Sequence, residues 1–201
     1  MNYIFKKDPM IKDLDLHDSF PVIIRVRSFT EAAAKEFSSL MMRAHNTGQT
    51  VIPIIIDSYG GQVYSLMSMI SDIKNSRLPV ATIVQGKAMS CGAILFSFGQ
   101  EGMRYMDEDS TVMIHDVSSM GWGKVEEIKA DAAEAERLNK KIFHMMAKNC
   151  GKNKKYFLDL IHEKGHADWY LDSDECLEHN LTNKVEVPTM NVDVSVSITL
   201  E

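Results

Sequence analysis

The chain has 201 residues, with 22 lysine and arginine residues against 28 aspartate and glutamate residues, and a formal net charge of −6 at neutral pH. This length fits a single domain over residues 1–201, and the acidic balance argues against a nucleic-acid partner, because phosphate binding requires an excess of cationic side chains. No apolar run approaches the roughly 20 residues that span a bilayer, so we expect no membrane partner.

The cysteines and the first residues bear on cofactors and cellular location. Cys91, Cys150 and Cys176 form neither a paired framework nor a metal-binding spacing such as C-x-x-C. We therefore expect no metal and no cofactor, and a reducing, cytoplasmic environment. Residues 1–20 lack the apolar core of a signal peptide, and we interpret them as a divergent N-terminal segment.

The first half of the chain alternates strand and helix patterns. Residues 21–27 predict a strand, and Ser28 to Glu31 resembles a capping box that begins a helix over 31–45. An apolar, β-branched run at 51–57 predicts a buried strand that ends in a Gly60-Gly61 turn. The pattern then predicts a helix at 62–77, a strand at 79–86, a helix at 88–99 and a strand at 111–115. This alternation indicates an α/β domain of crossover units in a mostly parallel sheet.

The longest predicted helix covers residues 124–150 and is followed by Gly151, which we expect to end it. Its first half is polar on all sides, so we expect that half to project into solvent or to contact another subunit. Its second half carries apolar residues that we expect a neighbouring subunit to cover, namely Ile142, Phe143, Met145 and Met146.

The remaining elements are short. We predict a helix within 152–165, a short helix within 168–181 and a strand at 183–188. The tail, residues 188–201, alternates polar and apolar side chains from residue 191 on, which is typical of an exposed strand.

The turns at the strand ends carry the candidate chemistry. Ser90 lies between an apolar strand and a helix of small residues, where unpaired backbone N–H groups are available for a developing oxyanion. Gly60-Gly61 allows a second backbone N–H to approach a ligand closely. His115 ends the next strand and is a candidate base for the serine hydroxyl. Each feature alone is more often structural, as a helix cap, a turn or a core histidine; their order is the specific signal.

Three segments of the chain resemble the Clp proteolytic subunit in its own order. The sequence IIIDSYGGQV is similar to I-N-S-P-G-G-x-V, GKAMSCGA to G-x-A-A-S-M-G-A, and STVMIHDV to the segment V-M-I-H-Q-P. The helix at 124–150 then matches the family's handle helix in position, and ADWYLDSDECLEHNLTNKV resembles the family's D-x-F-L ending. The resemblance runs from about Pro21 to Val187.

This resemblance implies a ClpP/crotonase-like fold of repeated β-β-α crossover units with a protruding handle helix. It implies a serine endopeptidase with Ser90 as nucleophile, His115 as base and Asp168 as the orienting carboxylate, with oxyanion donors at Gly61 and Cys91. Only the D-x-aromatic-Leu match selects Asp168 over two nearby carboxylates, those of Asp172 and Asp174. As partners it implies unfolded protein or peptide substrates, copies of the chain in a heptamer or double heptamer, and an AAA+ unfoldase.

The chain departs from the family pattern at several positions. Tyr59 replaces a proline, Cys91 a methionine, and Asp116-Val117 a Gln-Pro pair. His166-Ala167 replaces an Asp-Arg pair that assists ring stacking in the family, so we expect stacking that is weaker or sensitive to pH, since histidine gains charge near neutral pH. The N-terminal axial-loop segment is not recognisable, which puts unfoldase docking in question. Such divergence suits a phage or plasmid relative, including Clp-like proteases that process capsid proteins.

Four alternatives to a peptidase with a serine nucleophile and a histidine base remain. Signal peptide peptidases use a serine-lysine dyad, for which Lys87 and Lys124 are candidates. Cys91 is a rival nucleophile, because a helix N-terminus lowers thiol pKa values. Crotonase-type acyl-CoA enzymes share the fold but do not require Ser90, and a catalytically silent ring subunit or scaffold requires no activated serine at all.

Overall fold

The computed structural model describes residues 20–118 and 123–191. The predicted tail strand and the N-terminal segment fall almost wholly outside these ranges. The described residues form six helices: α1 (Glu31–Ala44), α2 (Val63–Lys74), α3 (Cys91–Phe96), α4 (Val125–Asn149), α5 (Tyr156–Glu163) and α6 (Ser173–Glu178). They form seven strands: β1 (Ile24–Val26), β2 (Ile52–Ser58), β3 (Val80–Met89), β4 (Arg104–Met106), β5 (Thr111–Ile114), β6 (Trp169–Leu171) and β7 (Lys184–Val185).

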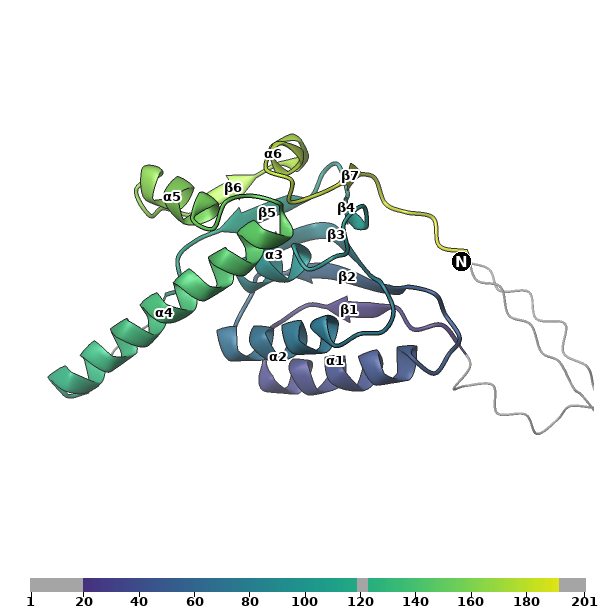
Figure 1. Ribbon diagram of the computed structural model, residues 1–201, viewed down its shortest axis with the longest axis horizontal. Helices are drawn as coiled ribbons and strands as arrows, with labels where there is room; N and C mark the ends of the chain where they lie inside the picture. Colours follow the sequence, from purple (N-terminus) through teal and green to yellow (C-terminus); the bar gives the residue numbers. More distant parts are fainter. Residues whose placement is uncertain (1–19, 119–122, 192–201) are drawn as a thin grey trace, which may run out of the picture.

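The strands form one mixed sheet in the order β1-β2-β3-β4-β7, with β5 and β6 off this path (Figure 1). Every pair in the sheet is parallel except β5 with β6. Strand β3 pairs with β2 on one side and is long enough to pair with two strands on the other, with β4 through its first half and with β5 through its last three residues. The predicted α/β fold with a mostly parallel sheet is therefore confirmed.

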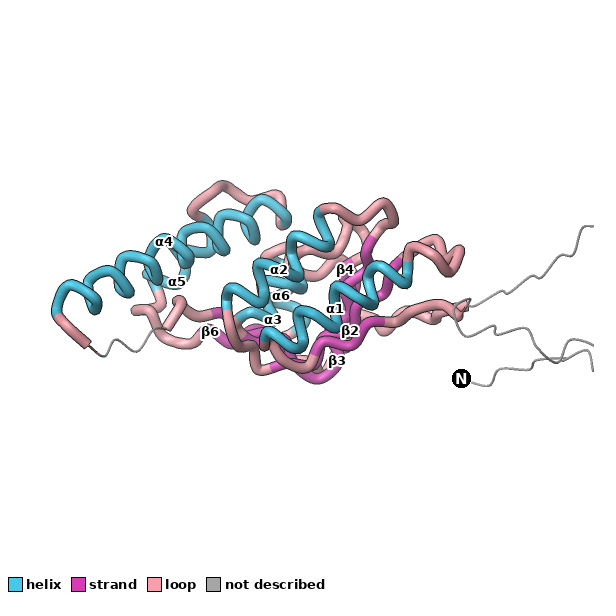
Figure 2. Tube along the Cα trace, turned by 90° about the horizontal axis from the view of Figure 1, so that it is seen from below, coloured by secondary structure: helices cyan, strands magenta, loops and turns pink. Residues whose placement is uncertain are grey.

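Strand β2 and the first two helices contribute to a core that also includes residues of α3, α4 and α5. Ile52, Ile54 and Ile56 on one face of β2 are fully buried and Ile55 on the other face is 6% exposed, as expected for a strand covered on both faces. Helix α1 buries Phe37 and Met41 one turn apart, and each such side chain contributes about 1.5–3 kcal/mol. Helices α1 and α2 lie side by side against the sheet in both views (Figures 1 and 2).

Two predicted boundaries were wrong. The N-cap of α1 is Thr30, whose side chain accepts a hydrogen bond from the Ala33 N–H, and not Ser28. Strand β3 continues to Met89, although its last residues were predicted to begin a helix. Pairing of Lys87–Met89 with Thr111–Met113 supplies ladder hydrogen bonds that outweigh the local helix preference of these small residues.

Helix α4 has two different halves. Its first half projects away from the rest of the fold, as its polar sequence predicts (Figure 1). The expectation that a neighbouring subunit covers its second half was wrong for Ile142, Phe143 and Met146, which are buried within the subunit. Helices α3 and α5 contact this half, so the monomer itself supplies the apolar surface. The exposed apolar side chains lie instead near the projecting end, at Val125 and Ile128.

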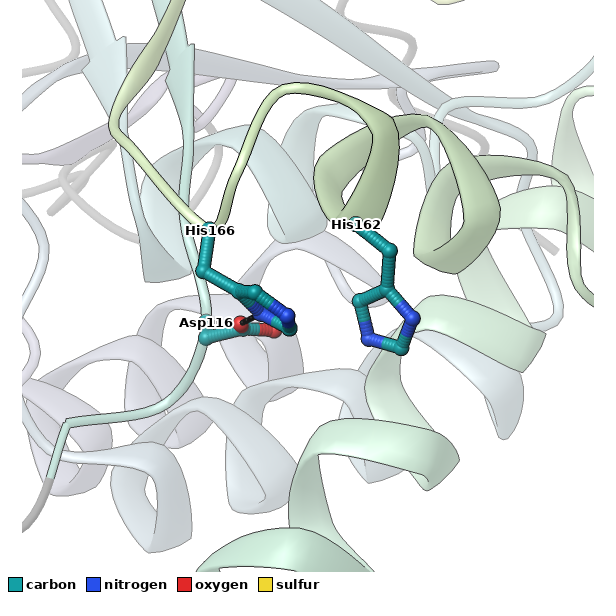
Figure 3. A group of neighbouring side chains, drawn as sticks. All are labelled: Asp116, His162 and His166. Carbon is teal, nitrogen blue, oxygen red and sulfur yellow. Dashed lines mark hydrogen bonds and ion pairs between the residues drawn. The ribbon is translucent and has the colours of Figure 1, made fainter.

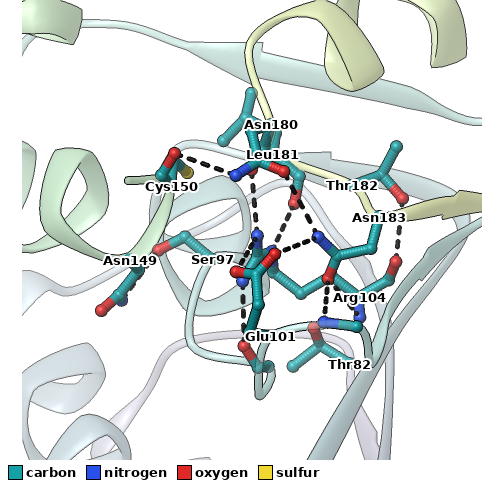
Figure 4. Close-up of polar contacts among 12 residues, drawn as sticks. Thr82, Ser97, Glu101, Arg104, Asn149, Cys150, Asn180, Leu181, Thr182 and Asn183 are labelled. Atoms are coloured by element: carbon teal, nitrogen blue, oxygen red, sulfur yellow. Dashed lines mark hydrogen bonds and ion pairs between the residues drawn. The ribbon is translucent and has the colours of Figure 1, made fainter. Parts of the chain in front are cut away.

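A buried arginine ties the C-terminal segment to the sheet. Arg104, on a strand that the sequence did not predict, is 1% exposed and donates from Nε to the Leu181 carbonyl over 3.0 Å. Its Nη2 donates to the Asn180 carbonyl and to Glu101, and its Nη1 to the Gly99 carbonyl (Figure 4). A guanidinium is tolerated in a core only when its donors are matched in this way. The segment that follows α6 is thereby fixed against β4.

Candidate active site

Strand register brings the three predicted side chains to one edge of the sheet. Met89 pairs with Met113, and the Ser90 N–H extends this ladder by donating to the Met113 carbonyl over 2.8 Å. The end of β5, followed by His115, is thus held beside Ser90. On its other side, β5 pairs with β6 in antiparallel register, with Ile114 opposite Trp169. The next position in that register sets His115 opposite Asp168.

The histidine and the carboxylate lie near each other without a hydrogen bond. His115 Nδ1 is 4.0 Å from Asp168 Oδ1, which is within ion-pair range but longer than a hydrogen bond. The Asp168 side chain is 54% exposed and that of His115 24%. Among the described residues, no hydrogen bond joins His115 to Ser90. Catalytic hydrogen bonds are often long before substrate binds, so the separation of these side chains is compatible with a catalytic triad in a substrate-free state.

Ser90 has a backbone conformation that few residues adopt. Its φ is 55° and its ψ is −118°, between the end of β3 and the start of α3. A non-glycine residue in such a region stores about 1–3 kcal/mol of strain, which the surrounding structure must hold. Two backbone hydrogen bonds hold it, since its N–H is paired with β5 and its carbonyl accepts from the Ile94 N–H over 3.2 Å. Such a strand-to-helix turn exposes a serine hydroxyl.

The two glycines before α2 are required by close backbone approach. Gly60 has a φ of 104°, and a β-carbon there would lie 2.7 Å from the β-carbon of Ser90. Gly61 has a φ of 146°, and a β-carbon there would lie 2.6 Å from the Phe29 carbonyl oxygen. Any side chain at either position would displace backbone, because no L-residue shows contacts this short. The Gly-Gly turn is therefore packed directly against the Ser90 turn.

A cleft joins these elements. The N–H of Cys91, the first residue of α3, has no carbonyl one turn earlier in the helix to receive it. No hydrogen bond within the described part of the chain engages the Gly61 N–H. Both residues border the cleft with Ser90 and His115; its other lining residues are Val63, Ile94, Ile114, Val117, Ser118 and Ile142.

The Cys91 thiol is not prepared for nucleophilic attack. Cys91 is 2% exposed, and burial raises the pKa of its thiol to about 11, although the backbone of Gly61 acts in the opposite direction. Only the thiolate is an effective nucleophile. The expectation that a helix N-terminus lowers this pKa was wrong, because desolvation is the larger effect.

The candidate lysine bases are engaged elsewhere. Lys87 Nζ lies 2.6 Å from Asp57 Oδ1 and 4.3 Å from the ring centre of Tyr59. The hydrogen bond to Asp57 raises the pKa of Lys87, which keeps the amine protonated and unable to accept a proton. Lys124 is the N-cap residue of α4. Neither lysine lines the cleft.

The other candidate carboxylates have structural roles. Asp172 is the N-cap of α6, where its side chain accepts a hydrogen bond from the Glu175 N–H over 2.9 Å. Asp174 lies in the first turn of that helix. Neither forms an ion pair with His115 in the described structure.

An ion pair that the sequence did not predict lies next to His115 and Asp168. His166 Nδ1 lies 2.6 Å from Asp116 Oδ2, and Asn139 on α4 donates to Asp116 Oδ1 over 2.6 Å. Partial burial alone would raise the pKa of Asp116, but the hydrogen bonds from His166 and Asn139 outweigh it and lower that pKa. Aligning the segments around His115 and Asp168 as antiparallel neighbours would have revealed the pair.

Comparison with known families identifies the group of proteins to which the chain belongs. A sequence model of the Clp protease family matches residues 14–188, which include every residue of the cleft and both segments that carry the ion pair. No helix among the described residues is both long and apolar enough to cross a membrane. With most of its length matched, the chain belongs to the Clp protease family of serine peptidases.

Proposed function

We propose that this chain is a serine endopeptidase that cleaves unfolded proteins or peptides with Ser90 as nucleophile, His115 as base and Asp168 as orienting carboxylate. The observation that carries the proposal is the strained Ser90 turn, which shares one cleft with His115 and Gly61. Strain of this kind concentrates at functional sites. A helix cap needs no such conformation, since caps have extended backbone.

The proposed reaction has two halves, in which Ser90 is first acylated and the resulting ester is then hydrolysed. Neutral His115 removes the proton from Ser90 Oγ as the oxygen attacks the substrate carbonyl, and the resulting oxyanion accepts hydrogen bonds from the Gly61 and Cys91 N–H groups. His115 then donates the proton to the departing amine, which leaves an ester on Ser90. Water, deprotonated by His115, hydrolyses the ester and restores the serine. Asp168 must approach His115 from 4.0 Å to hold the imidazole in this cycle.

We further propose that the enzyme works in the cytoplasm as a closed ring, heptameric or doubly heptameric by family resemblance, with an AAA+ unfoldase as a supplier of substrate. Support for assembly comes from the projecting end of α4, where Val125 is 67% and Ile128 40% exposed. Apolar side chains on an isolated helix end are stabilised by contact with a neighbour. The three cysteines are free and buried, which fits a reducing compartment.

A catalytically silent ring subunit is the alternative. The 4.0 Å separation of His115 and Asp168 and the exposure of Asp168 favour it, because a silent subunit has no need of a closed relay. Such a protein would assemble but would not hydrolyse peptides.

Hydrolysis of fluorescein-labelled casein distinguishes these functions. We expect turnover by the wild type, none by Ser90→Ala or His115→Ala, and unchanged turnover by Lys87→Ala. Inactivation by Lys87→Ala with activity kept in His115→Ala would replace the proposal by a serine-lysine dyad. Native mass spectrometry of the same samples tests the ring, and a fully active monomer would refute the chamber.

A further inference from the structure

Three side chains beside the candidate active site form a cluster of metal-binding type. Asp116, His162 and His166 each offer one ligand atom, and these atoms lie within 4.8 Å of one another. Figure 3 shows the imidazole of His162 facing the His166–Asp116 pair from the end of α5. The two imidazole rings are 4.4 Å apart between centroids. The three residues come from two segments that the fold brings together, namely the loop after β5 and the end of α5 with the turn that follows it.

The chemistry of the cluster selects a class of cation. Two imidazole nitrogens and one carboxylate oxygen suit Zn²⁺ and similar transition metals, whereas Mg²⁺ and Ca²⁺ prefer oxygen ligands alone. His162 and His166 have the H-x-x-x-H spacing that is frequent among zinc ligands. The prediction of a metal-free protein rested on cysteine spacing and did not weigh this pair.

The carboxylate is also oriented as a ligand would be. Asn139 donates to Asp116 Oδ1, and the Asn139 side-chain oxygen accepts from the Val117 N–H over 3.0 Å. This leaves Oδ2 directed at His166. Partners of this kind fix ligand orientation in metal sites and commonly change affinity by 10–100-fold.

We propose that Asp116, His162 and His166 bind one Zn²⁺ ion per chain, with water in the remaining coordination position. The ion takes the place of the direct contact between His166 Nδ1 and Asp116 Oδ2. The position of His162 distinguishes a metal site from a simple ion pair. His162 takes no part in the Asp116–His166 hydrogen bond, but its ring nitrogen lies close enough to serve as the third ligand.

The site would link the two segments that carry the proposed catalytic residues. Asp116 directly follows His115, and His166 precedes Asp168 by two residues. A metal between them would restrict the relative movement of these segments. Any effect on hydrolysis rests on the proposed function, whereas Zn²⁺ binding itself does not, so each can fail without the other.

Isothermal titration calorimetry of the full chain, stripped of metal by a chelator, tests the proposal with ZnCl₂ as titrant. We expect saturable binding of one Zn²⁺ per chain and no binding of Mg²⁺. The variants His162→Gln and Asp116→Asn should weaken Zn²⁺ binding at least tenfold. His144→Gln, which removes a histidine of α4 outside the cluster, should bind as the wild type does.

Thermal unfolding gives a second measurement on the same proteins. Zn²⁺ should raise the Tm of the wild type and of His144→Gln but not that of His162→Gln, since a ligand stabilises only the state that binds it. Wild-type protein without saturable binding would overturn the proposal. Equal affinity in wild type, His162→Gln and Asp116→Asn would also overturn it, because the ion would then occupy other histidines.

Discussion

The two sides of the candidate active site are built with different rigidity. On the nucleophile side, the Ser90 turn is held by two backbone hydrogen bonds and is packed against Gly60 with no space for a side-chain carbon. On the acid-base side, His115 follows the end of β5 and Asp168 precedes the start of β6. The His115 Nδ1 and Asp168 Oδ1 atoms are 4.0 Å apart. Backbone packing fixes one half, while side-chain placement leaves the other adjustable.

This difference suggests a division of work. The nucleophile and the oxyanion donors need geometry fixed before the reaction, because reorganisation would cost transition-state stabilisation. The side chains of His115 and Asp168 can move together when substrate, a neighbouring subunit or an ion orders the segments that carry them. Perturbing the rigid half should therefore have larger effects than perturbing the adjustable half.

The largest effect is expected from Ser90→Ala. Removing the hydroxyl eliminates the attacking atom, so peptide turnover should fall by at least about 1,000-fold. The free energy of unfolding should change by less than about 1 kcal/mol, since the substitution leaves the backbone hydrogen bonds in place. Peptidase kinetics and urea denaturation measure the two quantities. Activity that survives in Ser90→Ala would make another group the nucleophile.

The packing of the rigid half is tested by Gly60→Ala. The added carbon would lie 2.7 Å from the Ser90 β-carbon, so it must displace the serine. A displacement of about 1 Å can cost roughly 100-fold in rate, and we expect at least that loss in kcat/KM. Gly48→Ala is the matched control, because Gly48 also has a positive φ, 79°, but open space around it. Equal activity in both variants would refute the packing argument.

The adjustable half is tested by Asp168→Asn. We expect kcat to fall by less than it does for the serine variant, because the oxyanion donors and the base proposed here remain. Asp174→Asn, which changes a nearby carboxylate on α6, should keep wild-type kcat. If Asp174→Asn inactivated the enzyme while Asp168→Asn did not, the assignment from strand register would be wrong.

The smallest effect is expected at Cys91. With a thiol pKa of about 11, only roughly one molecule in 1,000 carries the thiolate at pH 8, and alkylation should accelerate as pH rises toward 11. Cys91→Ala should retain turnover within a few-fold, because the group proposed as oxyanion donor is its backbone N–H. Rates of iodoacetamide labelling, followed by mass spectrometry, provide the measurement. Rapid labelling of Cys91 at pH 7 would restore the thiol as a candidate nucleophile.

Much of the rigid half could be predicted from sequence because its signals are local. The apolar run of β2 predicts a buried strand, and Gly60-Gly61 and Ser90 are positions where a turn must follow a strand. Family resemblance then gave these positions chemical roles. The strain at Ser90 could not be predicted, since it depends on pairing with β5.

The adjustable half depends on contacts that are distant in sequence. The Asp116–His166 pair joins residues 50 positions apart, and it depends on the antiparallel pairing of β5 with β6 that brings these segments together, which the local pattern does not give. The prediction that a neighbouring subunit covers Ile142 and Phe143 failed for the same reason. The surfaces of α5 and α3 that contact this half of α4 are distant in sequence and come together only in the fold. Buried Arg104 shows the same limit, since two of its partners, the carbonyls of Asn180 and Leu181, lie more than 70 positions away in the sequence.

Fluorophosphonate labelling tests the central claim most directly, because this reagent modifies only a serine whose hydroxyl is activated by a base. Intact mass should show one adduct per chain, and peptide mapping should locate it on Ser90. The adduct should be absent from Ser90→Ala and His115→Ala, and it should form at the wild-type rate in Lys87→Ala. An unlabelled wild type would contradict the account and favour a silent subunit, and an adduct on a different serine would contradict the assignment of the nucleophile.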